Sequence, residues 1–214
     1  MAHELTLALG NRDDLTWAQR VVLEQHYLHQ PVDPRARPMA YILRRDGIPC
    51  GLVIVGIPHA TRCNGWWGYP GLPTQWQVVD LCRIWLSPVV QRGGYWAEPG
   101  IVPGYIDRHG TFRPTVATWL IKQVLAAVQV DRVRLWPPVY PDQPYQIELA
   151  ISYHDPRFHR GTIYREAQAL PMYQFAGVPV AGASGKYGWC WRLPSPAWSW
   201  EELDDIQPRT LRLL

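Results

Sequence analysis

Four side chains with acid, base or ligand chemistry stand close together in residues 152–164. They offer a hydroxyl, a carboxylate, an imidazole and a phenol: Ser152, Asp155, His159 and Tyr164. A positioned carboxylate or phenol can exchange a proton with a reacting group, and imidazole and carboxylate are metal ligands. Ser152 and Asp155 could equally form a pair that caps a turn.

The residues around this cluster predict a strand followed by a helix. Alternating apolar residues through Ile151 indicate a strand, which is expected to stop in residues 153–156 because Pro156 has no N–H for a ladder. After Gly161 apolar side chains recur at helical spacing, at Ile163, Ala167 and Leu170. The cluster therefore stands where a strand gives way to a helix, and open α/β folds usually bind ligands at such places.

His26 and Tyr27 form a second candidate pair, at the end of a predicted helix. The helix dipole alone favours a histidine there, so one interpretation is structural. In the other, His26 is a metal ligand or a base, and Tyr27 is a proton donor or a ring that stacks on a nucleobase. An iron site of the facial type needs two histidines and a carboxylate, and the most plausible set is Asp155 with His26 and either His29 or His159.

Residues 77–86 predict a buried central strand, which Asp80 and Arg83 interrupt. Three apart on a strand, the two side chains face opposite sides and are not a simple mutual salt bridge. Polar groups in a central strand need partners, so each belongs to a structural ion pair or to a site. We expect Arg83 to face a cleft and to anchor a phosphate or the carboxylate of a donor.

Several further strands are expected: 4–9, 39–44, 50–57 and 187–193. A helix that Asn11, Asp13 or Asp14 can cap follows the first of them. The turn Asp46-Gly47 joins the second and third as a hairpin.

Residues 87–113 predict a long loop, and a helix is expected from Thr115 or Thr118 to Val128. Loops of this length usually cover a site or bind something. Residues 1–194 are expected to form a single domain, and residues 195–214 a C-terminal tail.

The composition of the 214-residue chain excludes some classes of protein. Its four cysteines are scattered, which argues against a zinc ribbon or a disulfide scaffold and indicates a reducing compartment. Neither a signal peptide nor an apolar run long enough to cross a membrane is seen, so a cytoplasmic protein without a membrane partner is expected. No Gly-x-Ser-x-Gly or Cys-His nucleophile motif supports a hydrolase.

The net charge of +3 does not by itself indicate a nucleic-acid binder. Lysine occurs only at Lys122 and Lys186, so nearly all positive charge is arginine, the better fork for phosphate and for stacking on bases. High-GC coding bias would produce the same ratio. The 21 prolines indicate long ordered loops, and some of the 12 tryptophans could serve as stacking surfaces.

The order of the expected elements resembles the GCN5-related N-acetyltransferase (GNAT) fold, an α/β fold with a mixed central sheet flanked by helices. Here it would carry long insertions rich in Pro, Gly and Trp. Particular residues resemble the Mom-type DNA-modification proteins of phages such as Mu: His26-Tyr27, Asp80-Leu81-Cys82-Arg83, Ser152-Tyr153-His154-Asp155 and His159-Arg160-Gly161-Thr162-Ile163-Tyr164. The similarity is spread over residues 20–193, with insertions at 87–113 and 136–145. Residues 152–164 are its most specific part.

This resemblance implies a phage or prophage enzyme that adds a carbamoylmethyl group to the exocyclic amine of adenine in double-stranded DNA and so blocks restriction. It also implies a link to iron. The catalytic residues it implies are His26, Tyr27, Ser152, Asp155 and Tyr164. The metal ligands would be His26, Asp155 and His159.

Residues 91–94, Gln-Arg-Gly-Gly, are not a clean Arg/Gln-x-x-Gly-x-Gly/Ala loop. In acetyltransferases of the GNAT fold, that loop holds the pyrophosphate of coenzyme A on backbone N–H groups. The small-molecule donor therefore stays open between acetyl-CoA and another acyl donor. The expected donor-binding residues are Asp80, Arg83, Gln91, Arg92, Gly93 and Gly94.

A base inside a duplex must be flipped out before it reacts, and aromatic loops can fill the space it leaves. Two loops carry suitable side chains: Trp66, Trp67, Tyr69, Tyr95 and Trp96. The arginines expected to line the DNA path are Arg35, Arg37, Arg62, Arg92 and Arg108. Two other hypotheses are an acetyl-CoA-dependent N-acetyltransferase for a small molecule or peptide, and a non-enzymatic interaction protein on the same scaffold.

Overall fold

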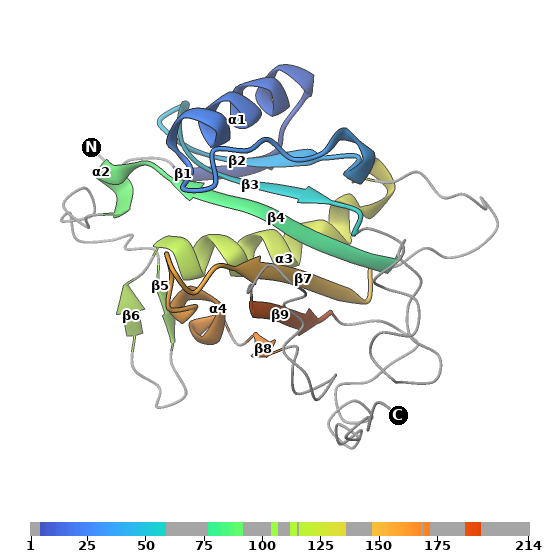
Figure 1. Ribbon diagram of the computed structural model, residues 1–214. Helices are drawn as coiled ribbons and strands as arrows, with labels where there is room; N and C mark the ends of the chain where they lie inside the picture. Colours follow the sequence, from blue (N-terminus) through green and yellow to red (C-terminus); the bar gives the residue numbers. More distant parts are fainter. Residues whose placement is uncertain are drawn as a thin grey trace. The chain divides into compact units, whose positions relative to one another are not determined.

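The computed structural model describes residues 5–58, 77–91, 104–106, 112–114, 116–135, 147–167, 169–171 and 187–193 (Figure 1). The chain forms two compact units. The first comprises Met1–Val55 and Cys82–Ala127, and the second comprises Gly56–Leu81 and Val128–Leu214. None of the helices in the described part is long and apolar enough to cross a membrane.

Three antiparallel strands begin the first unit: β1 (Leu5–Leu9), β2 (Met39–Arg45) and β3 (Ile48–Gly56). Asp46 and Gly47 join β2 to β3 with φ angles of 51° and 80°. Positive φ at both central residues is what a two-residue turn of type I′ requires, and Asp-Gly is a favoured pair for it. The predicted hairpin is confirmed.

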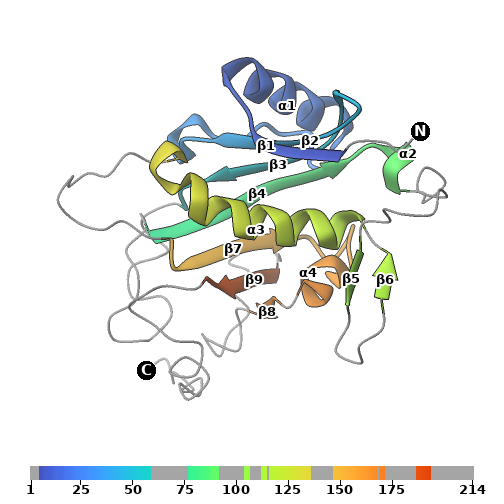
Figure 2. The same cartoon turned by 180° about the vertical axis from the view of Figure 1, so that it is seen from behind.

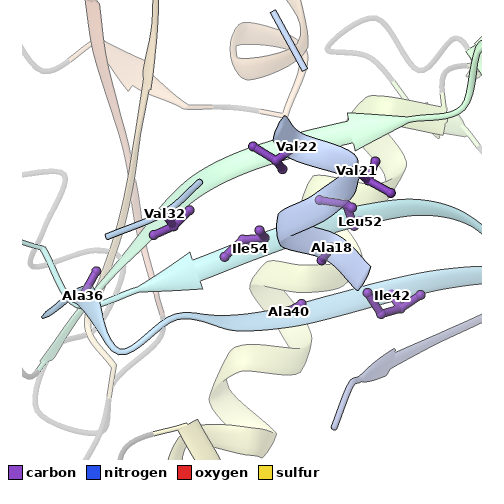
Figure 3. Close-up of a cluster of buried hydrophobic side chains, with 9 residues drawn as sticks. All are labelled: Ala18, Val21, Val22, Val32, Ala36, Ala40, Ile42, Leu52 and Ile54. Carbon is purple, nitrogen blue, oxygen red and sulfur yellow. The ribbon is translucent and has the colours of Figure 1, made fainter. Parts of the chain in front are cut away.

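Helix α1 (Arg12–Gln25) packs on this sheet through a small apolar core. Asn11 caps the helix: its side chain accepts the N–H groups of Asp13 and Asp14, and the Asp14 side chain accepts the N–H of Asn11. Figure 3 shows the core side chains between α1 and the strands: Ala18, Val21, Val22, Val32, Ala36, Ala40, Ile42, Leu52 and Ile54. The capped amphipathic helix expected from the sequence is confirmed.

Strand β4 (Val78–Leu86) lies between β3 and β7 in the strand order, as expected of a central strand. Its first residues, through Leu81, belong to the second unit and the rest to the first. The expected long loop at 87–113 is wrong in part, because it contains helix α2 (Pro88–Gln91), strand β5 (Gly104–Ile106) and the start of β6 (Phe112–Pro114). β5 and β6 pair as a separate antiparallel ribbon. Each strand has only three residues, too few for an alternating pattern to predict a strand.

In the second unit, β7 (Leu149–His154) pairs parallel to β4 and antiparallel to β9 (Tyr187–Arg192) (Figure 2). The strand continues further than expected, because Tyr153 still pairs with Gly188 and His154 with Tyr187. Pro156 lies two residues past the last paired residue, so its missing N–H costs the ladder nothing.

The helix expected after Gly161 is only α4 (Thr162–Glu166), so the extension to Leu170 is wrong. Leu170 instead begins the short strand β8 (Leu170–Pro171), which pairs with β9. A residue that precedes proline is disfavoured in the helical conformation, which explains this outcome.

Helix α3 (Val116–Leu135) continues past the predicted end at Val128. Residues 129–135 contain neither Gly nor Pro, and the first helix breaker is Pro137. The 3-10 helix η1 (Pro34–Ala36) completes the described elements.

Candidate functional site

A buried carboxylate closes the turn that follows β7. Asp155 is 1% exposed. Its Oδ1 accepts the backbone N–H of Arg157 at 2.9 Å, and its Oδ2 accepts Nη2 of Arg157 at 2.6 Å. Its backbone carbonyl accepts the N–H groups of Phe158 and His159, each at 3.0 Å. Asp155 therefore fixes the conformation of the turn, which is the turn-capping role that the sequence left open.

Ser152 does not pair with Asp155 to cap this turn. Its hydroxyl is buried and donates to the carbonyl of Leu81 at 2.9 Å. This bond links β7 to β4 within the second unit. Tyr153 continues the strand, so Ser152 and Asp155 do not share one turn.

The imidazole of His154 lies next to this carboxylate in sequence and is 4% exposed. Its Nδ1 accepts the indole N–H of Trp189 at 2.7 Å, so the neutral ring carries its proton on Nε2. Burial lowers the pKa of His154, and the neighbouring His159 lowers it further, whereas Asp155 raises it. His154 is therefore neutral in the folded protein around pH 7.

Tyr164 joins His154 and Trp189 in one aromatic cluster. Its ring centroid lies 5.9 Å from that of His154 and 5.7 Å from that of Trp189. Trp191 contacts the same ring at 6.1 Å and donates its indole N–H to the carbonyl of Ala167 at 2.9 Å. The predicted catalytic phenol thus belongs to a side chain that is packed and 7% exposed.

Gly161 has to be glycine for two reasons. Its φ of 68° lies in the left-handed region, where a side chain is disfavoured. A Cβ there would also lie 2.7 Å from Cζ2 of Trp189 and 2.9 Å from Cε1 of His154. The aromatic cluster therefore extends under the turn and into the start of α4.

Sequence reasoning missed Trp189 and the role of His154. The alternation of the strand at 187–193 was the available signal, because it places Trp189 and Trp191 on the same face of β9. Which partner that face would meet could not be read from the alternation.

In the first unit, His26 is the C-cap of α1 and is 7% exposed. Its ring stacks on Tyr27 with centroids 4.4 Å apart, and its Nδ1 accepts the N–H of Leu28 at 3.2 Å. His29, at φ 46°, places Nδ1 3.0 Å from the carbonyl of Leu23, where an N–H on that nitrogen would donate. Side-chain contacts of both histidines therefore hold the end of the helix.

Arg83 uses two of its N–H groups on backbone carbonyls of the first unit. Nη1 donates to Cys82 at 2.7 Å and Nε to Gln30 at 3.2 Å. Asp80 lies opposite Ile151 in the pairing of β4 with β7. Arg35 pairs with Asp33 at 2.6 Å, and Arg37 ends η1 at φ 47°.

Within the described residues, no group of three or more His, Cys, Asp or Glu side chains could hold a metal ion. Asp155 and His159 of the expected set belong to the second unit, and His26 belongs to the first. The expected set thus draws on both units, and it stays a prediction.

Gln91 is the last residue of α2. The other residues expected to bind the donor or DNA lie outside the described residues: Arg62, Trp66, Trp67, Tyr69, Arg92, Gly93, Gly94, Tyr95, Trp96 and Arg108.

Two solved structures with a similar fold are of an aminoglycoside acetyltransferase. The chain is similar to aminoglycoside acetyltransferase AAC(6')-Ib in complex with coenzyme A, at 13% identity and a TM-score of 0.51, over 95% of this chain and 99% of that one. It is similar to the same enzyme with coenzyme A and kanamycin at 14% identity, a TM-score of 0.51 and the same coverage. Neither a known protein family nor a curated protein matches the sequence. The likeness confirms the predicted GNAT-like α/β fold.

Proposed function

We propose that this GNAT-like chain is a transferase that adds a carbamoylmethyl group, or an acyl group, to the exocyclic amine of adenine in DNA. The observation that carries the proposal is the agreement between a motif and a fold. Residues 152–164 resemble the Mom-type proteins, and that resemblance implies a GNAT-like fold. The chain has a GNAT-like fold, and this agreement supports the expectation from the motif.

The chemistry of adenine sets what the protein has to do. The exocyclic nitrogen is a poor nucleophile because its lone pair is delocalised into the ring. As the new bond from nitrogen to the donor carbon forms, the leaving group departs with its electron pair and a base takes a proton from nitrogen. The adenine must also leave the duplex, because its amine is out of reach inside the duplex.

The resemblance assigns this proton transfer to His26, Tyr27, Ser152, Asp155 and Tyr164. The contacts of the second unit support a positioning role for Asp155, whose carboxylate is occupied by Arg157. In the first unit, His26 carries its proton on Nε2 when neutral, because Nδ1 accepts a backbone N–H. Under the proposal Arg83 anchors the donor with the N–H groups that the backbone does not use.

Nucleoside analysis tests the proposal. DNA from bacteria that express the chain should yield, after digestion, a deoxyadenosine heavier by the transferred group in mass spectrometry. The same DNA should resist restriction endonucleases whose sites contain adenine. Asp155→Ala should abolish the product. Asp33→Ala, which removes a similar but more exposed carboxylate, should retain it.

Digests that contain only ordinary nucleosides would contradict the proposal, provided that the expressed protein is folded. A product that persists in Asp155→Ala would remove the role of the turn but keep the activity.

The second candidate is an acetyl-CoA-dependent N-acetyltransferase that acts on a small molecule. Its support is the likeness to an acetyltransferase with coenzyme A and kanamycin over nearly the whole chain. Thiol release from acetyl-CoA in the presence of kanamycin or another amine, without any DNA product, would favour it.

A further inference from the structure

The turn after Asp155 presents an aromatic ring among basic side chains. Residues 156–160 are all exposed. Phe158 is 54% exposed and belongs to a small set of large apolar side chains on the described surface. A lone exposed phenylalanine is not unusual, so its neighbours decide what it means.

Three of these neighbours are positively charged. Residues 156–165 contain Arg157, Arg160 and Arg165 and no acidic residue. Burial lowers the pKa of His159, so its imidazole does not add to this positive charge around pH 7. The preceding carboxylate, Asp155, is buried, whereas the side chain of Arg157 is 75% exposed. The surface of the turn is therefore cationic even though the whole chain carries a net charge of only +3.

The turn is also held in one conformation. The carbonyl of Asp155 accepts the N–H groups of Phe158 and His159, and its carboxylate accepts the N–H of Arg157. The guanidinium carbon of Arg157 lies 5.6 Å from the centroid of the Phe158 ring, which is a cation–π distance. A ring that is already ordered loses little entropy when it binds.

We propose that residues 156–160 form a DNA-docking surface on which Phe158 stacks against an unpaired base and Arg160 contacts a phosphate. A flat ring beside guanidinium groups is the combination that proteins use on unstacked nucleic acid. One exposed ring is too little apolar surface to anchor a chain in a membrane. The inference rests on the proposed function, because it names the contacts by which that substrate is held.

Binding of the full chain to fluorescent DNA tests the inference. The probes are a fully paired duplex and a duplex with one unpaired adenine, followed by fluorescence anisotropy. Phe158→Ala should weaken binding to the second duplex by about 5- to 150-fold, the loss expected for one stacked base. Phe158→Trp keeps a flat ring and should retain the affinity.

Two variants of the first unit serve as matched controls. Leu23→Ala removes a side chain that is 52% exposed, close to the 54% of Phe158, and should leave binding unchanged. Arg160→Ala should weaken binding to both duplexes and reduce the slope of log K against log salt by about 1. Arg20→Ala, another exposed arginine, should change neither.

Equal effects of Phe158→Ala and Leu23→Ala would overturn the inference, as would vesicles of phosphatidylglycerol that bind through Phe158 while DNA does not. If DNA is modified normally in the Phe158→Ala and Arg160→Ala variants, with wild-type affinity, only the docking surface is wrong. If these variants lose DNA affinity but the wild-type chain yields no modified nucleoside, the docking surface stands and the proposed function falls.

Discussion

The tripeptide Asp-Pro-Arg occurs in both units, and its local bonds are nearly the same in each. At Asp33-Pro34-Arg35 and at Asp155-Pro156-Arg157, Oδ1 of the aspartate accepts the backbone N–H of the arginine at 2.9 Å, and Oδ2 accepts Nη2 at 2.6 Å. The hydrogen bond to aspartate raises the pKa of both guanidinium groups. The three residues thus make the same local bonds in both units.

The two turns differ in what surrounds them. The side chain of Asp33 is 35% exposed, and that of Asp155 is 2% exposed. Water can replace the bonds of the first carboxylate but not those of the second. The left-handed residue that follows is Arg37 in the first unit, whereas Gly161 in the second packs against aromatic rings. The comparison shows that packing, rather than the local motif, makes one turn part of a candidate site.

The largest expected effect comes from Gly161→Ala. It should lower the free energy of unfolding by about 3 kcal/mol, of which about 1 comes from the left-handed backbone and the rest from overlap with Trp189 and His154. Gly47→Ala is the matched control in the first unit, because its φ is 80° but nothing lies within 4 Å of the new Cβ. Urea unfolding measures both, and equal losses would show that packing adds nothing at Gly161.

The next largest effect is expected from removing each carboxylate, which should lower the free energy of unfolding by different amounts at the two turns. Asp155→Ala should cost about 2 kcal/mol, because it removes the hydrogen bonds that a buried carboxylate accepts from Arg157. Asp33→Ala should cost clearly less, since the Asp33 carboxylate is partly exposed to water. Thermal unfolding of the two variants side by side is the measurement. A larger loss for Asp33→Ala would contradict the comparison.

The smallest expected effect depends on pH and concerns the buried His154. Burial lowers its pKa in the folded state below the ordinary value of about 6.5, so the unfolded chain binds more protons as pH falls. This contribution to stability is complete above about pH 6.5 and is lost on acidification toward the folded-state pKa. Among the charged neighbours, His159 and Arg165 oppose protonation of His154, and Asp155 favours it.

His154→Gln keeps a possible acceptor for the Trp189 N–H but removes the titration. Its free energy of unfolding should therefore fall less between pH 7 and acid than that of the wild type. His29→Gln replaces an exposed histidine and should keep the wild-type profile. Parallel profiles for the His154→Gln variant and the wild type would exclude His154 as the source.

Features with short-range causes were predictable from the sequence. The turn at Asp46 and Gly47, the cap at Asn11 and the central strand β4 all appear as expected. Two of the errors fall where the outcome depended on a distant partner. β7 continues to His154 because β9 is there to pair with it, and Leu170 joins β8 for the same reason.

The candidate site divides in the same way. The sequence by itself determined that residues 152–164 bring a carboxylate, a histidine, a glycine and a phenol together, because neighbours along a chain cannot separate far. Only the tertiary structure decided that Asp155 is buried, that His154 accepts a bond from Trp189 and that Ser152 reaches Leu81. Burial and long-range hydrogen bonds depend on which segments pack together, and a pattern within one segment contains no record of its partner.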